Sequence, residues 1–174
     1  MLAQGPTTNL TFARHVDIAL TESHADQIIG GANALLSCDS HYGTLARVQP
    51  ILLLPAVIGG QAFDGAVTSW ATMRELMQEP GNIKIVKEID ICVNANGIPI
   101  PGSFVGCVPL RTLVADPKIA LAYSSNNEEG MVLAHEYSHV RGLSHRGDPG
   151  ALMNPNFAAD NKELSPEECN LLYP

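Results

Sequence analysis

HEYSHVRGLSH, residues 135–145, is the stretch of this sequence that decides both its fold and its chemistry. His135 and His139 are four residues apart, so on a helix their side chains lie on one face, one turn apart. Two neutral imidazoles at that spacing can bind one Zn²⁺ ion at about 2.0–2.1 Å. Glu136 adjoins the first histidine and can point at a water molecule on the metal. We therefore predict a helix that carries two metal ligands and a general base.

Gly142 allows the same stretch to supply a third ligand. Glycine readily adopts the left-handed backbone conformation that ends helices. The chain can then turn and present His145 to the metal. Three protein ligands leave the fourth position of a tetrahedral zinc open to water, which is typical of a catalytic site. The other three histidines of the chain have no ligand spacing, so we interpret them as ordinary surface or core residues.

The complete pattern, H-E-x-x-H-x-x-G-x-x-H, resembles that of the metzincin clan of zinc endopeptidases. That clan also has a methionine in a tight turn beneath the metal, and ALMNP, residues 151–155, supplies Met153 at the expected place. Residues 135–155, HEYSHVRGLSHRGDPGALMNP, are most similar to the matrixins, the matrix metalloproteinase family. Asn154 stands where those enzymes usually have tyrosine. The resemblance implies a zinc endopeptidase that acts on protein or peptide substrates.

The resemblance also implies a fold, which is α+β of metzincin type. We expect a twisted, mixed and mostly parallel sheet with an antiparallel edge strand, backing helices and an active-site helix. We expect a single catalytic domain over residues 1–174. Its upper subdomain, residues 1–145, would end in the zinc helix. A small lower subdomain, residues 146–174, would hold the methionine turn and one terminal helix.

Local patterns in the rest of the chain are compatible with this fold. Thr21 is a good N-cap for a helix whose apolar residues follow one stripe as far as Leu36. Ser165, Pro166 and Glu168 have the residue types of the cap, first position and N3 position of a terminal helix. We expect a further helix over residues 64–79, and strands over residues 10–20, 48–58, 83–93, 105–114 and 119–123. The strand over residues 48–58 should be buried, and the alternating strand over residues 83–93 should be half exposed.

The mechanism follows from the proposed zinc ligands. Zinc lowers the pKa of its water towards 7 and polarises the scissile carbonyl, while Glu136 acts as general base and passes the proton to the leaving amine. We expect Met153 to form an apolar floor beneath the imidazoles and not to bind the metal. The sequence has no further histidine cluster before the helix and no EF-hand-like loop, which argues against structural calcium or a second zinc.

Two apolar residues are candidates for a substrate pocket. In matrixin-like clefts an extended substrate pairs with the edge strand, and the side chain after the cleaved bond enters a pocket. By resemblance, Phe157 falls where the wall of that pocket usually carries tyrosine, and Met131 falls where the family sets pocket depth. Both residues are apolar, so we expect cleavage before medium or large hydrophobic residues.

Composition excludes several classes of protein. The chain is 45% hydrophobic and 16% charged, which excludes a disordered tail or a coiled coil. Its formal charge is −8 and it has no Lys/Arg cluster, so we expect neither nucleic-acid binding nor attraction to an anionic membrane. The longest apolar run, residues 51–58, is too short to span a bilayer. We expect a monomer.

Four cysteines bear on the compartment: Cys38, Cys92, Cys107 and Cys169. An even count is compatible with two disulfides in a secreted protein, and Cys92 and Cys107 flank a turn-rich segment that could be a hairpin. The alternative is four buried thiols in an intracellular protein. We favour the secreted protein, although the first residues, MLAQGPTTNL, have no signal-peptide pattern.

Two other functions are compatible with the same residues. One is a zinc-binding interaction module that has lost proteolysis, against which Glu136 argues because such a module needs no base. The other is an aminopeptidase or another small-substrate zinc hydrolase. A blind pocket with a carboxylate for the substrate amine would favour that hydrolase, whereas an open cleft would exclude it.

Overall fold

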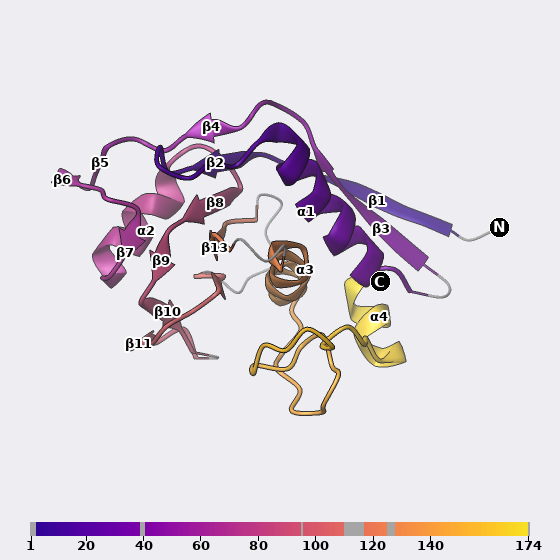
Figure 1. The fold of residues 1–174 in the computed structure, drawn as a ribbon. Helices are drawn as coiled ribbons and strands as arrows, with labels where there is room; N and C mark the ends of the chain where they lie inside the picture. The colour runs from indigo at the N-terminus through magenta and orange to yellow at the C-terminus, as the bar shows by residue number, and fades with distance from the viewer. Residues whose placement is uncertain (1–2, 39–40, 95, 110–116, 125–127, 174) are drawn as a thin grey trace.

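The computed structural model describes residues 3–38, 41–94, 96–109, 117–124 and 128–173, and its main sheet has five strands (Figure 1). The strand order is β12-β13-β8-β2-β4. The edge strand β12 is antiparallel to β13, whereas the other neighbours are parallel. The expected mostly parallel sheet with an antiparallel edge strand is thus confirmed. Its strands are β2 (Phe12–Arg14), β4 (Leu52–Leu53), β8 (Ile83–Val86), β12 (Gly106–Cys107) and β13 (Ile119–Ala122).

The remaining strands form four two-stranded pairs. β1 (Ala3–Leu10) and β3 (His41–Arg47) are parallel and extend from the sheet as a ribbon (Figure 1). The other pairs are short: β5 (Val57–Ile58) with β6 (Gln61–Ala62), β7 (Ala66–Val67) with β9 (Glu88–Ile89), and β10 (Ile91–Val93) with β11 (Pro99–Pro101). The sequence predicts one continuous strand over residues 48–58 and another over residues 83–93, but parts of both segments belong to these short pairs.

The prediction of one buried strand over residues 48–58 is wrong, because the segment contains only the two short strands β4 and β5. Pro50 and Pro55 lie within it, and proline cannot donate a ladder hydrogen bond. The predicted strand over residues 83–93 divides into β8, β9 and β10, which pair with different partners. Part of the strand predicted within residues 105–114 lies outside the described residues.

Helices cover both faces of the central sheet. In β8, Ile83 and Ile85 belong to a core shared with α1 (Glu22–Leu35) and α3 (Glu129–Val140), whereas Val86 packs with α2 (Trp70–Gln78) on the other face. This alternation is the side-chain period of a strand. We expected residues 83–93 to be half exposed, but β8 is buried on both sides because α2 covers its second face.

Capping residues set the ends of these helices. The side chain of Thr21 accepts a hydrogen bond from His24 N at the start of α1, as predicted. Helix α2 begins after the Ser69 cap, later than the segment that we predicted, because residues 66–67 form β7. At α4 (Pro166–Leu172), Ser165 and Glu168 form the expected capping box.

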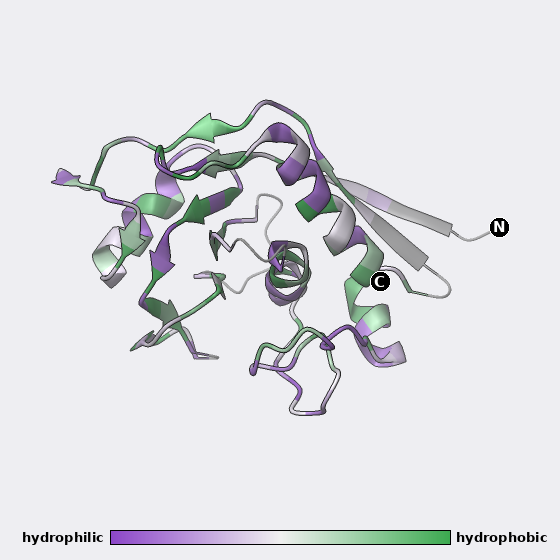
Figure 2. Ribbon diagram, viewed as in Figure 1, coloured by the Kyte–Doolittle hydropathy of each residue, from purple (hydrophilic) through white to green (hydrophobic). Residues whose placement is uncertain are grey.

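Helix α3 occupies the middle of the molecule and is buried along its whole length. It lies between the sheet and the segment of residues 141–165 (Figure 1). Hydrophobic colouring is strong on β8 and β4, whereas α3 is mixed in hydropathy despite its burial (Figure 2). Helix α1 crosses α3 closely, since a Cβ atom on Gly130 would lie 3.2 Å from Gly31 Cα. The polar residues inside this helix therefore need an explanation other than solvent exposure.

Two disulfides link distant parts of the chain. Cys38, just after α1, bonds to Cys169 in α4, and Cys92 in β10 bonds to Cys107 in β12. The described cysteines are therefore all oxidised, and the two expected disulfides are confirmed. Within the described parts of the chain, no helix has the length and apolar character needed to cross a membrane.

Candidate metal centre and cleft

Two buried histidines of α3 have their imidazoles oriented by backbone carbonyls. His135 Nδ1 lies 2.7 Å from Leu152 O, and His139 Nδ1 lies 2.8 Å from Leu143 O. A carbonyl oxygen only accepts, so each Nδ1 carries the ring proton and each Nε2 presents a lone pair. In metal sites, a hydrogen bond at the ring nitrogen that does not bind the metal fixes the orientation of the imidazole. Sequence spacing predicts the two histidines but not these two carbonyl partners.

The third histidine arrives from the loop after α3. Gly142 has a positive φ of 93°, so the helix ends there and the chain turns. His145 Nε2 then lies 3.3 Å from His135 Nε2 and 3.1 Å from His139 Nε2. Ligands at tetrahedral angles around one zinc ion are separated by about 3.3 Å. The three nitrogens are thus a donor set that suits zinc, and the described residues contain one such group of potential ligands.

Glu136 lies beside this group, buried against the edge strand of the sheet. A Cβ atom on Gly106 would lie only 2.7 Å from Glu136 Cγ and Oε1, and equally close to Val132 Cγ1. The carboxylate therefore packs directly on the β12 backbone at Gly106, which belongs to none of the motifs found in the sequence. An isolated glycine in a strand pattern indicates that another group approaches the backbone closely, but the pattern does not identify that group.

Gly106 also lies in β12, the edge strand of the sheet formed by the described residues. Val105 O accepts a hydrogen bond from Ala122 N, and Gly106 is paired opposite Leu121. Hydrogen-bonded and non-hydrogen-bonded pairs alternate along an antiparallel ladder. The N–H and C=O groups of Gly106 therefore point away from β13.

The three histidines, Glu136 and Gly106 all line one cavity of about 530 Å³. Its lining comes from β10 and β12 with their neighbouring segments, from the metal-site residues, and from the segment after the methionine turn. The lining residues are Cys92, Val93, Asn94, Ile100, Ser103, Phe104, Val105, Gly106, His135, Glu136, His139, His145, Pro155, Asn156 and Phe157. Glu136 is the one carboxylate among them.

The structure places the remaining candidate residues in different surroundings. Phe157 lines the cavity, with its ring centroid 5.6 Å from that of His135. Met153 is fully buried, and its carbonyl accepts a hydrogen bond from Arg146 N, next to the third histidine. Met131 instead lines a second hollow of about 290 Å³ between α1 and α3. Phe157 is therefore among the residues that line the cavity, whereas Met131 is not.

Asn154, which stands where matrixins usually have tyrosine, makes two hydrogen bonds within the methionine turn and its neighbouring residues. Asn154 Nδ2 donates to Asp148 O, and Asn154 Oδ1 accepts from Asn156 N. Asn154 is 8% exposed, so these bonds satisfy a nearly buried amide. An asparagine at this position therefore stabilises the turn through hydrogen bonds.

The fold and the three-histidine group together define a protein of metzincin-like fold. The sequence model of the family described as Matrixin matches residues 7–170. The chain therefore belongs to the matrixin family.

The chain is also similar to individual proteins, over different shares of their length. A segment of 35 residues is 54% identical to human neutrophil collagenase (Homo sapiens), which is 20% of this chain and 8% of that protein. Metalloproteinase-II from Bacteroides fragilis has a TM-score of 0.55 at 14% identity, over 98% of this chain and 52% of that one. Archaemetzincin from Methanopyrus kandleri has a TM-score of 0.47 at 16% identity, over 97% and 93%. The similarity to the Bacteroides structure concerns the fold, and the chain spans about half of that protein.

Proposed function

We propose that this chain is a zinc-dependent endopeptidase. The observation that carries the proposal is the convergence of three histidine Nε2 atoms and one buried carboxylate in a single cavity. His135, His139 and His145 would hold one catalytic zinc ion, and Met153 would form the apolar floor near them. Membership of the matrixin family supports this assignment.

The chemistry divides between the metal and the residues of the chain. A bound zinc ion supplies a Lewis acid that polarises the peptide carbonyl and acidifies water. Glu136 accepts the proton of the attacking water and delivers it to the leaving amine nitrogen. The carbonyls of Leu152 and Leu143 keep two of the imidazoles in the tautomer that presents Nε2 to the cavity.

An extended peptide would bind along the open edge of β12. The backbone groups of Gly106 point away from β13, so a substrate strand can add to the sheet there. We propose cleavage before hydrophobic residues, since Phe157 offers an apolar surface beside His135. Burial of a leucine- or phenylalanine-sized side chain contributes about 1.5–3 kcal/mol, which is enough to discriminate against polar residues.

The cavity lining favours an endopeptidase over a small-substrate hydrolase. An aminopeptidase needs a carboxylate for the substrate amine in addition to its general base. Among the described residues that line the cavity, Glu136 is the one carboxylate, and the mechanism uses it as the base. The cavity also extends from the β10 and β12 region to the segment of residues 155–157, as a cleft between two subdomains would.

We further propose that residues 1–174 form one catalytic domain, with an upper subdomain (1–145) and a lower subdomain (146–174) that meet at this cavity. We propose an extracellular location for it. Two disulfides support that location, because such bonds persist in oxidising compartments.

The test compares wild type with Glu136→Gln, with Glu128→Gln as control because Glu128 is an exposed carboxylate at the start of the same helix. Zinc content and cleavage of a peptide library are measured for all three. We expect one zinc per chain throughout and a loss of hydrolysis by about 10²–10⁴-fold in Glu136→Gln alone. Unchanged hydrolysis in Glu136→Gln would contradict the mechanism. A zinc-loaded wild type that cleaves no peptide would favour the interaction module.

A further inference from the structure

His145 differs from the other two candidate ligands in how the chain holds it. His135 and His139 are buried on α3, whereas His145 is exposed and lies in a loop without regular secondary structure. A loop residue has more conformational freedom to lose than a helical one when it binds a metal. The position of this ligand therefore depends on contacts that its loop makes with the rest of the molecule.

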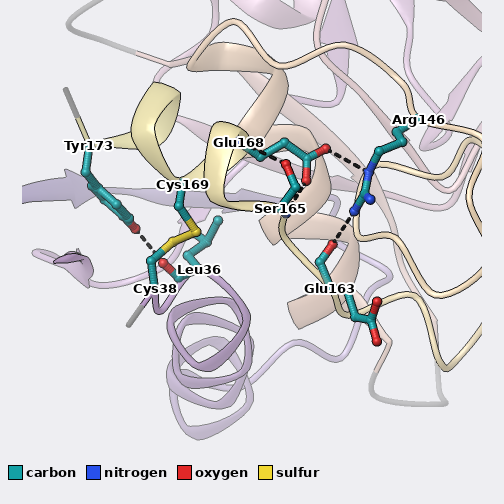
Figure 3. The surroundings of a disulfide bond; sticks show 8 residues. All are labelled: Leu36, Cys38, Arg146, Glu163, Ser165, Glu168, Cys169 and Tyr173. Atoms are coloured by element: carbon teal, nitrogen blue, oxygen red, sulfur yellow. Dashed lines mark hydrogen bonds and ion pairs between the residues drawn. A yellow bond between two sulfur atoms is a disulfide. The ribbon is translucent and has the colours of Figure 1, made fainter. Parts of the chain in front are cut away.

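The next residue, Arg146, contacts Asp148 in its own loop and three other parts of the chain. Its Nη1 donates to Asp148 Oδ2 at 3.2 Å, and its Nη2 donates to Glu163 O at 3.1 Å. Its Nε lies 3.2 Å from Glu168 Oε1 in an ion pair (Figure 3). Its backbone N–H donates to Met153 O at 2.9 Å. Arg146 thus links the ligand loop to the methionine turn through its backbone, and to Glu163 and α4 through its side chain.

Glu168 is itself held in place by the cap of α4. Its Oε2 accepts from Ser165 N at 2.7 Å, so the carboxylate caps the helix with one oxygen and pairs with Arg146 through the other. The Glu168 side chain is 12% exposed and the Arg146 side chain 31%, so the pair is partly shielded from water and salt. The neighbouring Glu167 has a lowered pKa, because hydrogen bonds from its own backbone and from Ser165 stabilise its charge and Arg146 adds a smaller attraction.

Helix α4 is in turn anchored to α1. The Cys38–Cys169 disulfide bonds it to the segment after α1, and Tyr173 OH donates to Leu36 O at 2.8 Å (Figure 3). Glu168 therefore belongs to a rigid part of the molecule. A guanidinium is planar and presents its donors in a fixed geometry. The contacts of Arg146 therefore hold its loop in place relative to Glu168.

We propose that Arg146 is a positioning residue for the metal centre, which holds His145 in place by tying its loop to Glu168. The inference rests on the proposed zinc site. The ion pair is distinct from the zinc ligands, so its loss should leave the donor set intact but less well ordered. Loss of an outer contact to a ligand typically weakens metal binding by about 10–100-fold, and we expect a change of that size.

Zinc affinity distinguishes positioning from a merely structural role. A contact that only stabilises the fold lowers the stability of the zinc-free protein but leaves the affinity of the folded protein unchanged. The dissociation constant is measured by competition with a chromophoric chelator, under conditions in which circular dichroism shows the zinc-free chain to be folded. The variants are Arg146→Ala, Arg146→Lys and Glu168→Gln. The control is Arg47→Ala, because Arg47 forms ion pairs with Glu22 and Asp26 of α1, away from the cavity.

We expect the zinc dissociation constant to rise about 10–100-fold in Arg146→Ala, to rise less in Arg146→Lys and Glu168→Gln, and to stay unchanged in Arg47→Ala. Wild-type affinity in Arg146→Ala, or an equal rise in Arg47→Ala, would overturn the inference while leaving the proposed function intact. A wild-type chain that binds no zinc would overturn both.

Discussion

Replacement of Gly106 by valine should inactivate the protein without removing its metal. A Cβ atom at this position would lie 2.7 Å from Glu136 Cγ and Oε1. Carbon atoms in good contact are about 3.5 Å apart, so the carboxylate would have to move by roughly 0.8 Å. The second close neighbour, Val132 Cγ1, belongs to a β-branched side chain in a helix, which adopts few other rotamers. Most of the displacement should therefore fall on Glu136.

A displacement of that size has a predictable kinetic cost. Misplacement of a catalytic group by 1 Å can cost about 10²-fold in rate, so we expect kcat/KM of Gly106→Val to fall by about 10²-fold. The three histidines do not depend on this contact, and zinc content should stay at the wild-type level. Gly106→Ala should show a smaller loss in the same direction.

The assay is cleavage of a quenched fluorescent peptide, with zinc content measured on the same samples. Gly30→Val is the matched control, because a Cβ atom on Gly30 would meet nothing within 4 Å. Wild-type kcat/KM in Gly106→Val would refute the reasoning. Loss of zinc together with activity would also refute it, since the effect would then lie at the metal centre.

Three further predictions concern stability, pH and specificity. Replacement of Cys92 and Cys107 by alanine should lower the free energy of unfolding by about 3 kcal/mol, because their disulfide closes a loop of 15 residues. Replacement of Cys38 and Cys169 should lower it by about 5 kcal/mol, because that disulfide closes a loop of 131 residues. Urea titration of the zinc-free chains measures both losses, and the reverse order would contradict this prediction. Metal ligation requires neutral imidazoles, so zinc and activity should be lost together below about pH 6; zinc that stays bound while activity falls would show that another group titrates. Phe157→Ala should weaken the preference for a hydrophobic residue after the cleaved bond in a peptide library, and a dominant charged residue there in wild type would contradict the pocket.

Local sequence spacing predicts the metal-binding half of the site well. His135 and His139 share a face because the helical period places residues four apart on one side, whatever surrounds them. Gly142 ends the helix for a reason that is equally local, a backbone conformation that glycine adopts at little cost. Thr21 and Ser165 similarly mark their helices through short-range hydrogen bonds. Features that depend on a few consecutive residues are therefore predictable from sequence.

The parts that the sequence does not predict depend on tertiary contacts. Gly106 and Glu136 are 30 residues apart, and no local pattern indicates that a carboxylate packs on that glycine. Met131 lies one turn before His135, and no local pattern indicates that its side chain lines the hollow between α1 and α3. The burial of β8 on both faces likewise depends on a tertiary contact, because α2, which ends shortly before β8 in the sequence, packs on the second face of this strand.

The most direct test of the account is anomalous diffraction at the zinc absorption edge from crystals of the wild-type chain. The account predicts one strong peak in the cavity, at about 2.0–2.1 Å from the Nε2 atoms of His135, His139 and His145, with Glu136 beside it and not bound to it. Absence of a peak there, or a zinc ion held by other residues of the chain, would contradict it.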